Sequence, residues 1–300
     1  LELEFMLLGR AFQALGAAAG QVLTRVLLFD VYGKARSASL IGYMTIAMVM
    51  GPMIAPIFAG FVSETIGWQN IFSLLFFASL IVFFWVLKSL PETRWLGSSQ
   101  RQKPQGLFEG LPLLKNWDFL SICGAWVFTS AVYFAFLAGA AFLVVEEMGK
   151  SEIEYGAYFV IASLCFMFGN LLSARFSGKV GLYRFVQCGT FLAILSVLTQ
   201  WLLLDIDHPL SVFLPMFGVA IANGLVMPNA AAMIMGVVPR LSGAASGLSG
   251  FLQIGFAAII TWLVGHFQFY HSFAMIIAMN ICAVLAVTCV FLARKIDDVE

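Results

Sequence analysis

Residues 7–25 read LLGRAFQALGAAAGQVLTR, and this stretch indicates the class of fold for the whole chain. It is apolar and long enough for a membrane-spanning helix, yet it contains an arginine. Spacings of three and four residues place on one helical face Arg10, Gln13, Ala17, Gln21 and Thr24. An arginine inside a span is costly unless it faces protein or water, so this face predicts a cavity wall. Pairing of Arg10 with nearby backbone carbonyls is the alternative interpretation.

The composition of the chain is that of a membrane protein. Of its 300 residues, 61% are hydrophobic and 11% are charged, whereas soluble domains are about half apolar and about a quarter charged. A transmembrane helix needs about 20 apolar residues. Nine segments have this length, approximately 5–30, 37–62, 70–90, 118–145, 156–174, 185–204, 211–237, 244–265 and 271–293. Because barrel strands are shorter and alternate in polarity, we predict an all-α polytopic membrane protein.

Basic residues are concentrated in alternate loops. One set of connections holds 13 of the 16 Lys and Arg residues, and the other set holds only Lys150. Because cytoplasmic loops carry excess Lys and Arg, this asymmetry predicts a cytoplasmic C-terminus. Acidic residues also number 16, so net charge predicts no nucleic-acid partner. The five cysteines lack CxxC spacing, and we predict neither a metal site nor a cofactor.

A polar connection over residues 91–116 divides the nine segments. It contains PETRWLGSSQRQKPQGLFEG, which is typical of a solvated cytoplasmic linker. Three predicted helices precede it, in residues 1–90, and six follow, in residues 117–300. A symmetric six-plus-six transporter has three more helices ahead of the first of these. Since the chain opens with LELEF and no initiator Met, we expect residues 1–90 to be the remainder of an N-terminal bundle.

Residues 7–39 resemble the fourth helix and following loop of major facilitator superfamily transporters, specifically drug:proton antiporters of the Bcr/CflA type. The family pattern of Arg, two residues, Gln and then small residues is present at Arg10, Gln13, Gly16 and Ala17, although Ala14 stands where Gly is usual. By this resemblance the fold is a major facilitator-type two-bundle fold comprising helices four to twelve. The resemblance also implies proton-coupling or cavity roles for Arg10, Gln13, Gln21, Arg25 and Asp30.

Two of these assignments have alternatives. Arg25 and Asp30 match the cytoplasmic end of the family pattern, but Phe29 stands where a second Arg is common. Snorkelling of Arg25 to the interface and a helix-end ion pair are equally compatible with the sequence.

Residues 42–61 read GYMTIAMVMGPMIAPIFAGF. Proline removes a backbone donor and glycine allows close approach, so a kinked, tightly packed helix is expected. The segment resembles the antiporter motif of the same superfamily, with Ala59 in place of one Gly. That resemblance implies a role in sealing the two bundles for Gly42, Gly51, Pro52, Pro56 and Gly60.

Two further groups of residues complete the predicted site. Residues 174–184, ARFSGKVGLYR, resemble the degenerate second copy of the cytoplasmic loop of the family, which implies a gate role for Arg175, Lys179 and Arg184. Simple positive-inside anchoring is the alternative. Polar and aromatic residues well inside the later spans are candidates for a substrate cavity: Tyr133, Phe134, Asn223, Asn229 and Gln253.

These observations predict a secondary active transporter of the bacterial inner membrane. We expect a monomer that exports small amphiphilic drug-like molecules by alternating access, driven by protons. Neither HExxH nor GxSxG is present, which disfavours an enzyme, and a channel lacks its repeated selectivity element. Two alternatives stay open: transport of a different small metabolite, and a chain that is inactive alone because the family's acidic first helix is absent. We expect efflux only when three upstream helices are added.

Overall fold

The computed structural model describes residues 3–67, 69–89, 110–268 and 273–293, and side-chain surroundings are omitted for some of them, including 51–61. Every regular element in these ranges is a helix, so the predicted all-α class is confirmed. In chain order the elements are α1 (Leu3–Ile66), α2 (Gln69–Ser89), η1 (Leu111–Lys115), α3 (Trp117–Ala141), η2 (Phe142–Glu147), α4 (Glu152–Val180), α5 (Leu182–Leu202), α6 (Leu210–Val237), η3 (Pro239–Leu241), α7 (Ser242–Gln268) and α8 (Ala274–Leu292). Eight segments of the described chain are long and apolar enough to span a membrane.

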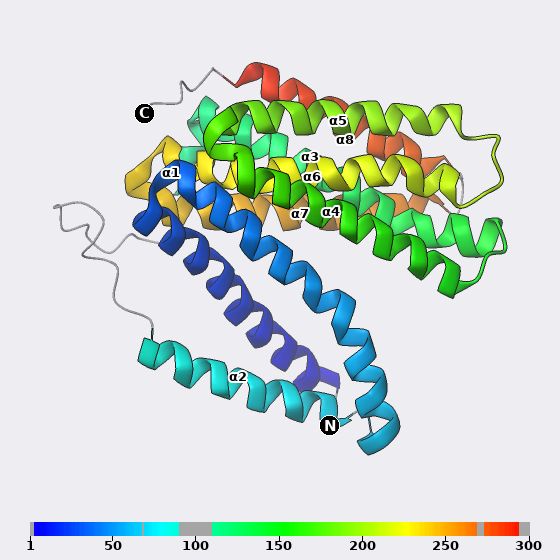
Figure 1. Ribbon diagram of the computed structural model, residues 1–300, viewed down its shortest axis with the longest axis horizontal. Coiled ribbons are helices and arrows are strands. Elements are labelled where there is room, and N and C mark those ends of the chain that lie inside the picture. The colour runs from blue at the N-terminus through cyan, green and yellow to red at the C-terminus, as the bar shows by residue number, and fades with distance from the viewer. Residues whose placement is uncertain (1–2, 68, 90–109, 269–272, 294–300) are drawn as a thin grey trace.

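Helix α1 is a hairpin of two arms. Its continuous helical assignment is interrupted at Gly33, whose φ of 70° and ψ of 177° are not helical. A residue with a Cβ rarely adopts this positive φ, so glycine allows the chain to reverse here. The first arm ends before Gly33 and the second runs back beside α4 (Figure 1). Two spans predicted separately from sequence are therefore joined by a one-residue break rather than by a loop.

Helices α3 to α8 form a compact C-terminal bundle with two adjoining apolar cores. One core contains Phe119, Trp126 and Met233 together with Ala38 and Ile41 from α1. The other contains residues such as Phe136, Phe213 and Met275, and among the described residues it receives none from α1 or α2. The N-terminal helices therefore share a core with only one end of the bundle.

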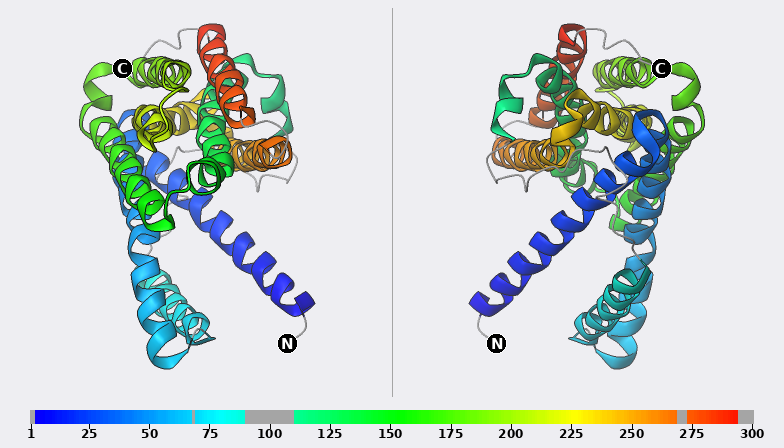
Figure 2. Two further views of the ribbon diagram at one scale, coloured as in Figure 1. Left: turned by 90° about the vertical axis from the view of Figure 1, so that its right-hand side faces the viewer. Right: turned by 90° about the vertical axis from the view of Figure 1, so that its left-hand side faces the viewer.

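The two ends of the C-terminal bundle differ in charge. We call one the basic end, because its connections carry Lys115, Arg175, Lys179, Arg184 and Arg240. The opposite connections carry Glu146, Glu147, Glu154, Asp205 and Asp207 beside a lone Lys150, and we call this the acidic end. The turn of α1 at Gly33 lies at the basic end, whereas α2 and the far parts of both α1 arms diverge from the bundle (Figure 2).

Small residues let helices of the bundle approach at backbone distance. A Cβ added to Gly169 of α4 would lie 2.3 Å from the Ile221 carbonyl oxygen of α6, and one added to Gly224 of α6 would lie 2.6 Å from the Asn170 nitrogen. Close glycine contacts of this kind stabilise helix pairs in lipid, where apolar burial contributes little. They fix α4 against α6.

The described end of the predicted linker is more ordered than the sequence suggested. Residues 90–109 lie outside the described part of the chain, but Leu111–Lys115 form the short helix η1. Leu113 is buried in the core that contains Phe119 and Trp126. The Asn116 side chain accepts hydrogen bonds from the backbone N–H groups of Asp118 and Phe119 and so caps α3. The prediction of a solvated linker up to residue 116 overlooked an apolar anchor and a helix cap.

Candidate translocation pathway

The predicted polar face of the first α1 arm is exposed. Arg10 donates from Nη1 to Gln13 Oε1 over 2.9 Å, and its guanidinium carbon lies 5.4 Å from the Phe72 ring centre of α2. Gln21 is also exposed. Spacings of three and four residues do bring Arg10 and Gln13 together, as helical geometry requires. Every residue from Phe5 to Gln21 whose side chain is described is exposed, so the polar face is one side of an arm that diverges from the bundle (Figure 2).

Arg25 lies instead at the contact between α1 and the bundle. It is only 5% exposed, and its guanidinium carbon is 5.3 Å from the ring centre of Trp126 on α3. Trp126 is 1% exposed. A cation over an indole face is attracted by the ring quadrupole, and more strongly where water is excluded. Arg25 Nε has no hydrogen-bond partner among the described atoms, so the aromatic face is the principal contact of this charge.

Asp30 occupies a different environment from Arg25. It is exposed, and no ion pair joins it to Arg25 within the described residues. The helix-end ion pair considered from sequence is therefore absent there, and the snorkelling alternative for Arg25 does not describe a side chain buried against Trp126.

The second α1 arm packs on α4 through small residues. Ser39 donates its hydroxyl hydrogen to the Ala174 carbonyl. A Cβ added to Gly42 would lie 3.0 Å from the Asn170 carbonyl oxygen and 3.2 Å from Ala174 Cβ. We call this set, with the Arg25 and Trp126 pair, the basic-end junction. Gly51, Pro52, Pro56 and Gly60 continue the same helix, but their surroundings lie outside the described side chains.

Two of the predicted cavity residues hydrogen-bond to one turn of α3. Asn223 on α6 donates from Nδ2 to the Thr129 carbonyl over 3.2 Å, and Gln253 on α7 donates from Nε2 to Ser130 Oγ over 3.2 Å. Asn223 and Gln253 therefore both bind α3 at neighbouring residues, one at the backbone and the other at a side chain. In this arrangement their amide donors link three helices of the bundle.

Asn229 lies on another face of α6. It is fully buried and donates to Ser173 Oγ on α4 over 2.5 Å. Six residues separate it from Asn223, which turns the two side chains about 120° apart on a helix. The sequence-based grouping of both asparagines in one cavity is not reproduced by this geometry.

Tyr133 and Phe134 are half-buried, with ring centres 5.7 Å apart in an edge-to-face arrangement.

The predicted gate residues Arg175, Lys179 and Arg184 are all exposed at the basic end. Gly181, with φ of 97°, forms the turn between α4 and α5 that presents them.

Sequence reasoning missed Trp126, Ala174 and the Gly169–Gly224 crossing. The chain has 7 Trp and 27 Gly, and each of these residues sits in an apolar helix without a local pattern that marks it. Only α1 carries a local signal for its contacts with the bundle, because small residues such as Gly42 recur in it and Arg25 is a polar residue within an apolar span. The partner on α3 or α4 follows from tertiary packing.

Within the described residues, six bundled helices are joined at one end to further span-length helices, which is the architecture of a polytopic membrane protein. The sequence matches the Major Facilitator Superfamily over residues 2–261, and the chain belongs to that family. The match identifies a transporter rather than an enzyme, as predicted from the sequence motifs.

Individual relatives agree with the predicted branch. The chain is 25% identical over 285 residues to a bicyclomycin resistance protein homolog of Haemophilus influenzae, covering 93% of this chain and 70% of that protein. It is 23% identical over 304 residues to the multidrug resistance protein MdtL of Shewanella oneidensis, covering 98% and 74%. It is also 28% identical over 159 residues to the multidrug transporter MdfA of Edwardsiella piscicida, covering 51% and 38%.

Proposed function

We propose that this protein exports small amphiphilic drug-like molecules by alternating access, driven by proton entry. The observation that carries the proposal is the one-ended contact between the N-terminal helices and the C-terminal bundle. Alternating access requires two groups of helices that close at one membrane face while they open at the other. The basic-end junction provides such a closed end, and the divergence toward the acidic end supports an open one (Figure 2).

The orientation follows from the loop charges. Since basic loops are retained in the cytoplasm, the basic end faces the cytoplasm and the C-terminus lies on that side of a bacterial inner membrane. The described arrangement then corresponds to an outward-facing state, closed toward the cytoplasm by Arg25, Trp126 and the α1–α4 contact.

The exposed α1 face supplies the polar part of the path. Arg10 is held by Gln13 rather than by a carboxylate of the described chain, so its charge is available to a substrate or to an acidic group. Such a cation changes the proton affinity of a nearby carboxylate, and this is the role proposed for Arg10, with Gln13 and Gln21 beside it. Proton coupling requires a carboxylate that gains and loses a proton. Asp30, twenty residues along the helix from Arg10 and exposed at the cytoplasmic end, is proposed for this role at that end and not as the neighbour of Arg10.

The substrate class is supported by the names of the relatives. They include a bicyclomycin resistance protein homolog and multidrug transporters. Abundant Phe and Met side chains, 30 and 13 in this chain, suit apolar molecules of varied shape. A monomer is sufficient for this mechanism because both groups of helices belong to one chain.

Transport by reconstituted protein tests the proposal. The chain is placed in liposomes alone and, in parallel, as a version extended upstream by three helices, the form expected to transport, and uptake of ethidium, a fluorescent amphiphilic cation, is followed after a proton gradient is imposed. Uptake that requires the gradient and stops on addition of a protonophore supports proton-driven export. Gradient-independent uptake contradicts proton coupling, and no uptake of ethidium or bicyclomycin favours either transport of another metabolite or an inactive chain.

A further inference from the structure

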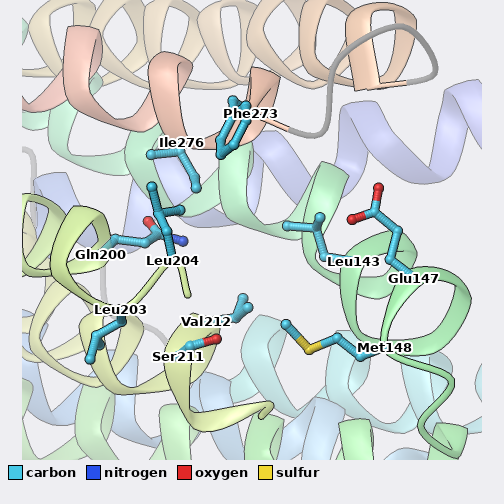
Figure 3. Close-up of a pocket in the computed structure, with 10 residues that line it drawn as sticks. All are labelled: Leu143, Glu147, Met148, Gln200, Leu203, Leu204, Ser211, Val212, Phe273 and Ile276. Atoms are coloured by element: carbon cyan, nitrogen blue, oxygen red, sulfur yellow. The ribbon is translucent and has the colours of Figure 1, made fainter. Parts of the chain in front are cut away.

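A cavity lies at the acidic end, away from the basic-end junction. Its volume is about 200 Å³, and it is formed where η2 and the adjoining ends of α5, α6 and α8 approach one another (Figure 3). The π-helical turn η2 ends α3 at this point and places Glu147 and Met148 beside the cavity. π-Helical turns are rare and are frequent at functional sites. The cavity belongs entirely to the C-terminal bundle.

The cavity wall is mainly apolar, with three polar side chains. Leu143, Val212 and Ile276 line it together with the Phe273 ring, and the polar groups come from Glu147, Gln200 and Ser211. Glu147 and Gln200 stand on opposite sides in Figure 3. An apolar chamber with a few convergent polar groups is the usual form of a small-molecule site.

Gln200 is the decisive residue. Its side chain is 2% exposed, and its Oε1 atom has no hydrogen-bond donor among the described atoms. A buried amide oxygen without a donor is costly and rare in native structures. Its amide group lies at the cavity wall (Figure 3), but the Oε1 atom itself is covered. An N–H or O–H group bound in the cavity therefore satisfies this acceptor once the Gln200 side chain turns toward it.

Charge selects among the molecules that carry such a donor. Glu147 contributes a carboxylate to the wall, and the connections at the same end of the bundle also carry Glu146, Glu154, Asp205 and Asp207. This field raises the local concentration of cations. The Phe273 ring and the Met148 sulfur are further soft partners for a cation with an apolar body.

The lining does not suit a metal ion. No group of three or more His, Cys, Asp or Glu side chains that could hold one occurs in the described chain. One carboxylate, one amide oxygen and one hydroxyl among apolar side chains offer an ammonium group its hydrogen bonds, and leave an apolar wall for its carbon skeleton.

We propose that the cavity between Glu147 and Gln200 binds organic ammonium ions that carry N–H donors and a compact apolar body. The site is separate from the path between the two groups of helices. Binding here is an equilibrium property that needs no transport, so a failure of drug export and a failure of this site are measured independently.

A set of three matched probes tests the site. The full chain is placed in phosphatidylcholine nanodiscs, and saturation-transfer NMR measures binding of 2-phenylethylammonium, its trimethylammonium analogue and 2-phenylethanol. We expect the primary ammonium to bind about tenfold more tightly than the other two, because only it combines positive charge with N–H donors to Gln200. Equal binding of the alcohol and the ammonium overturns the proposal. Binding would then depend on the apolar ring that both probes share, and not on positive charge or N–H donors.

Variants identify the atoms responsible. Gln200→Met keeps the shape of the side chain and removes the acceptor, so affinity for the primary ammonium falls about tenfold while the trimethyl analogue is unaffected. Glu147→Gln weakens both cations several-fold and reduces their dependence on salt, whereas the neighbouring Glu146→Gln, which does not line the cavity, changes affinity less than twofold. Equal effects of the two glutamate variants contradict the site, and because both positions are exposed this comparison holds even if Gln200→Met fails to fold.

Discussion

The guanidinium carbon of Arg25 lies 5.3 Å from the ring centre of Trp126, so a charge on α1 rests on an aromatic face of the C-terminal bundle. Both side chains are buried. A conformational change that separates the two groups of helices at the basic end must remove Arg25 from Trp126. The pair therefore contributes to the free energy of the closed state.

Trp126→Leu is expected to open the basic end. Loss of a desolvated cation–π contact costs about 2 kcal/mol, or about 30-fold in the equilibrium between closed and open states. Trp126→Phe keeps a weaker aromatic face and should have an intermediate effect. The measurement is maleimide labelling of a cysteine introduced by Ala38→Cys, because Ala38 is buried in the shared core. Native Cys282, buried in the other core, is the reference, and equal increases at both cysteines indicate unfolding instead.

Gly42→Ala is expected to weaken the same closed state from the α4 side. The added Cβ meets the Asn170 carbonyl oxygen at 3.0 Å and Ala174 Cβ at 3.2 Å, so the second α1 arm and α4 must separate by a few tenths of an ångström. Spin labels at the exposed positions Val31 and Val180 report the separation as a broadened distance distribution. Gly20→Ala is the control, since nothing lies within 4 Å of its added Cβ. Identical distributions for both variants would contradict a tight α1–α4 contact.

Gly169→Ala is expected to destabilise the bundle itself. Its Cβ would lie 2.3 Å from the Ile221 carbonyl oxygen, and overpacking of this kind costs about 1–3 kcal/mol. Gly156→Ala lies in the same helix with no atom within 4 Å of the added Cβ, so it should be neutral or slightly stabilising. Thermal unfolding in detergent measures both, and a Tm for Gly169→Ala equal to that of the control would show that α4 and α6 adjust freely.

The helices and the Arg10–Gln13 contact could be predicted from the sequence, because both depend on local spacing. Arg10 and Gln13 are three residues apart, and a helix brings any such pair together. Trp126 could not be predicted, since its partner lies about a hundred residues earlier and the contact depends on how α1 packs. The two asparagines of α6 also illustrate this limit. Both are polar residues in an apolar span, but only the packed neighbours reveal that Asn223 binds α3 and Asn229 binds α4.

Asn223→Leu separates a packing role from a substrate role. Its amide donates to the Thr129 carbonyl of another helix, and interhelical hydrogen bonds in membranes contribute about 0.6 kcal/mol on average. We expect a small fall in Tm and an unchanged substrate range in the transport assay. Asn280→Leu is the control, because the Asn280 amide donates within its own helix to Ile276. A changed order of substrate preference with unaltered Tm would instead place Asn223 in the substrate path.

Arg10→Ala tests whether the exposed α1 face takes part in transport. Arg10 lies inside a candidate span and is held by Gln13, with Phe72 beneath its guanidinium. A residue that only anchored the helix would be replaceable by Lys or Ala with little loss, because exposed cations contribute little to stability. If Arg10 acts on a substrate or proton-carrying group, Arg10→Ala abolishes gradient-driven uptake and Arg10→Lys retains part of it, since Lys keeps the charge but loses the planar fork of donors. Arg184→Ala, at an exposed basic-end position, is the comparison in the same liposomes, with protein incorporation measured for each variant. Equal losses for Arg10→Ala and Arg184→Ala at equal incorporation would mean that Arg10 serves orientation in the membrane and that the path lies elsewhere.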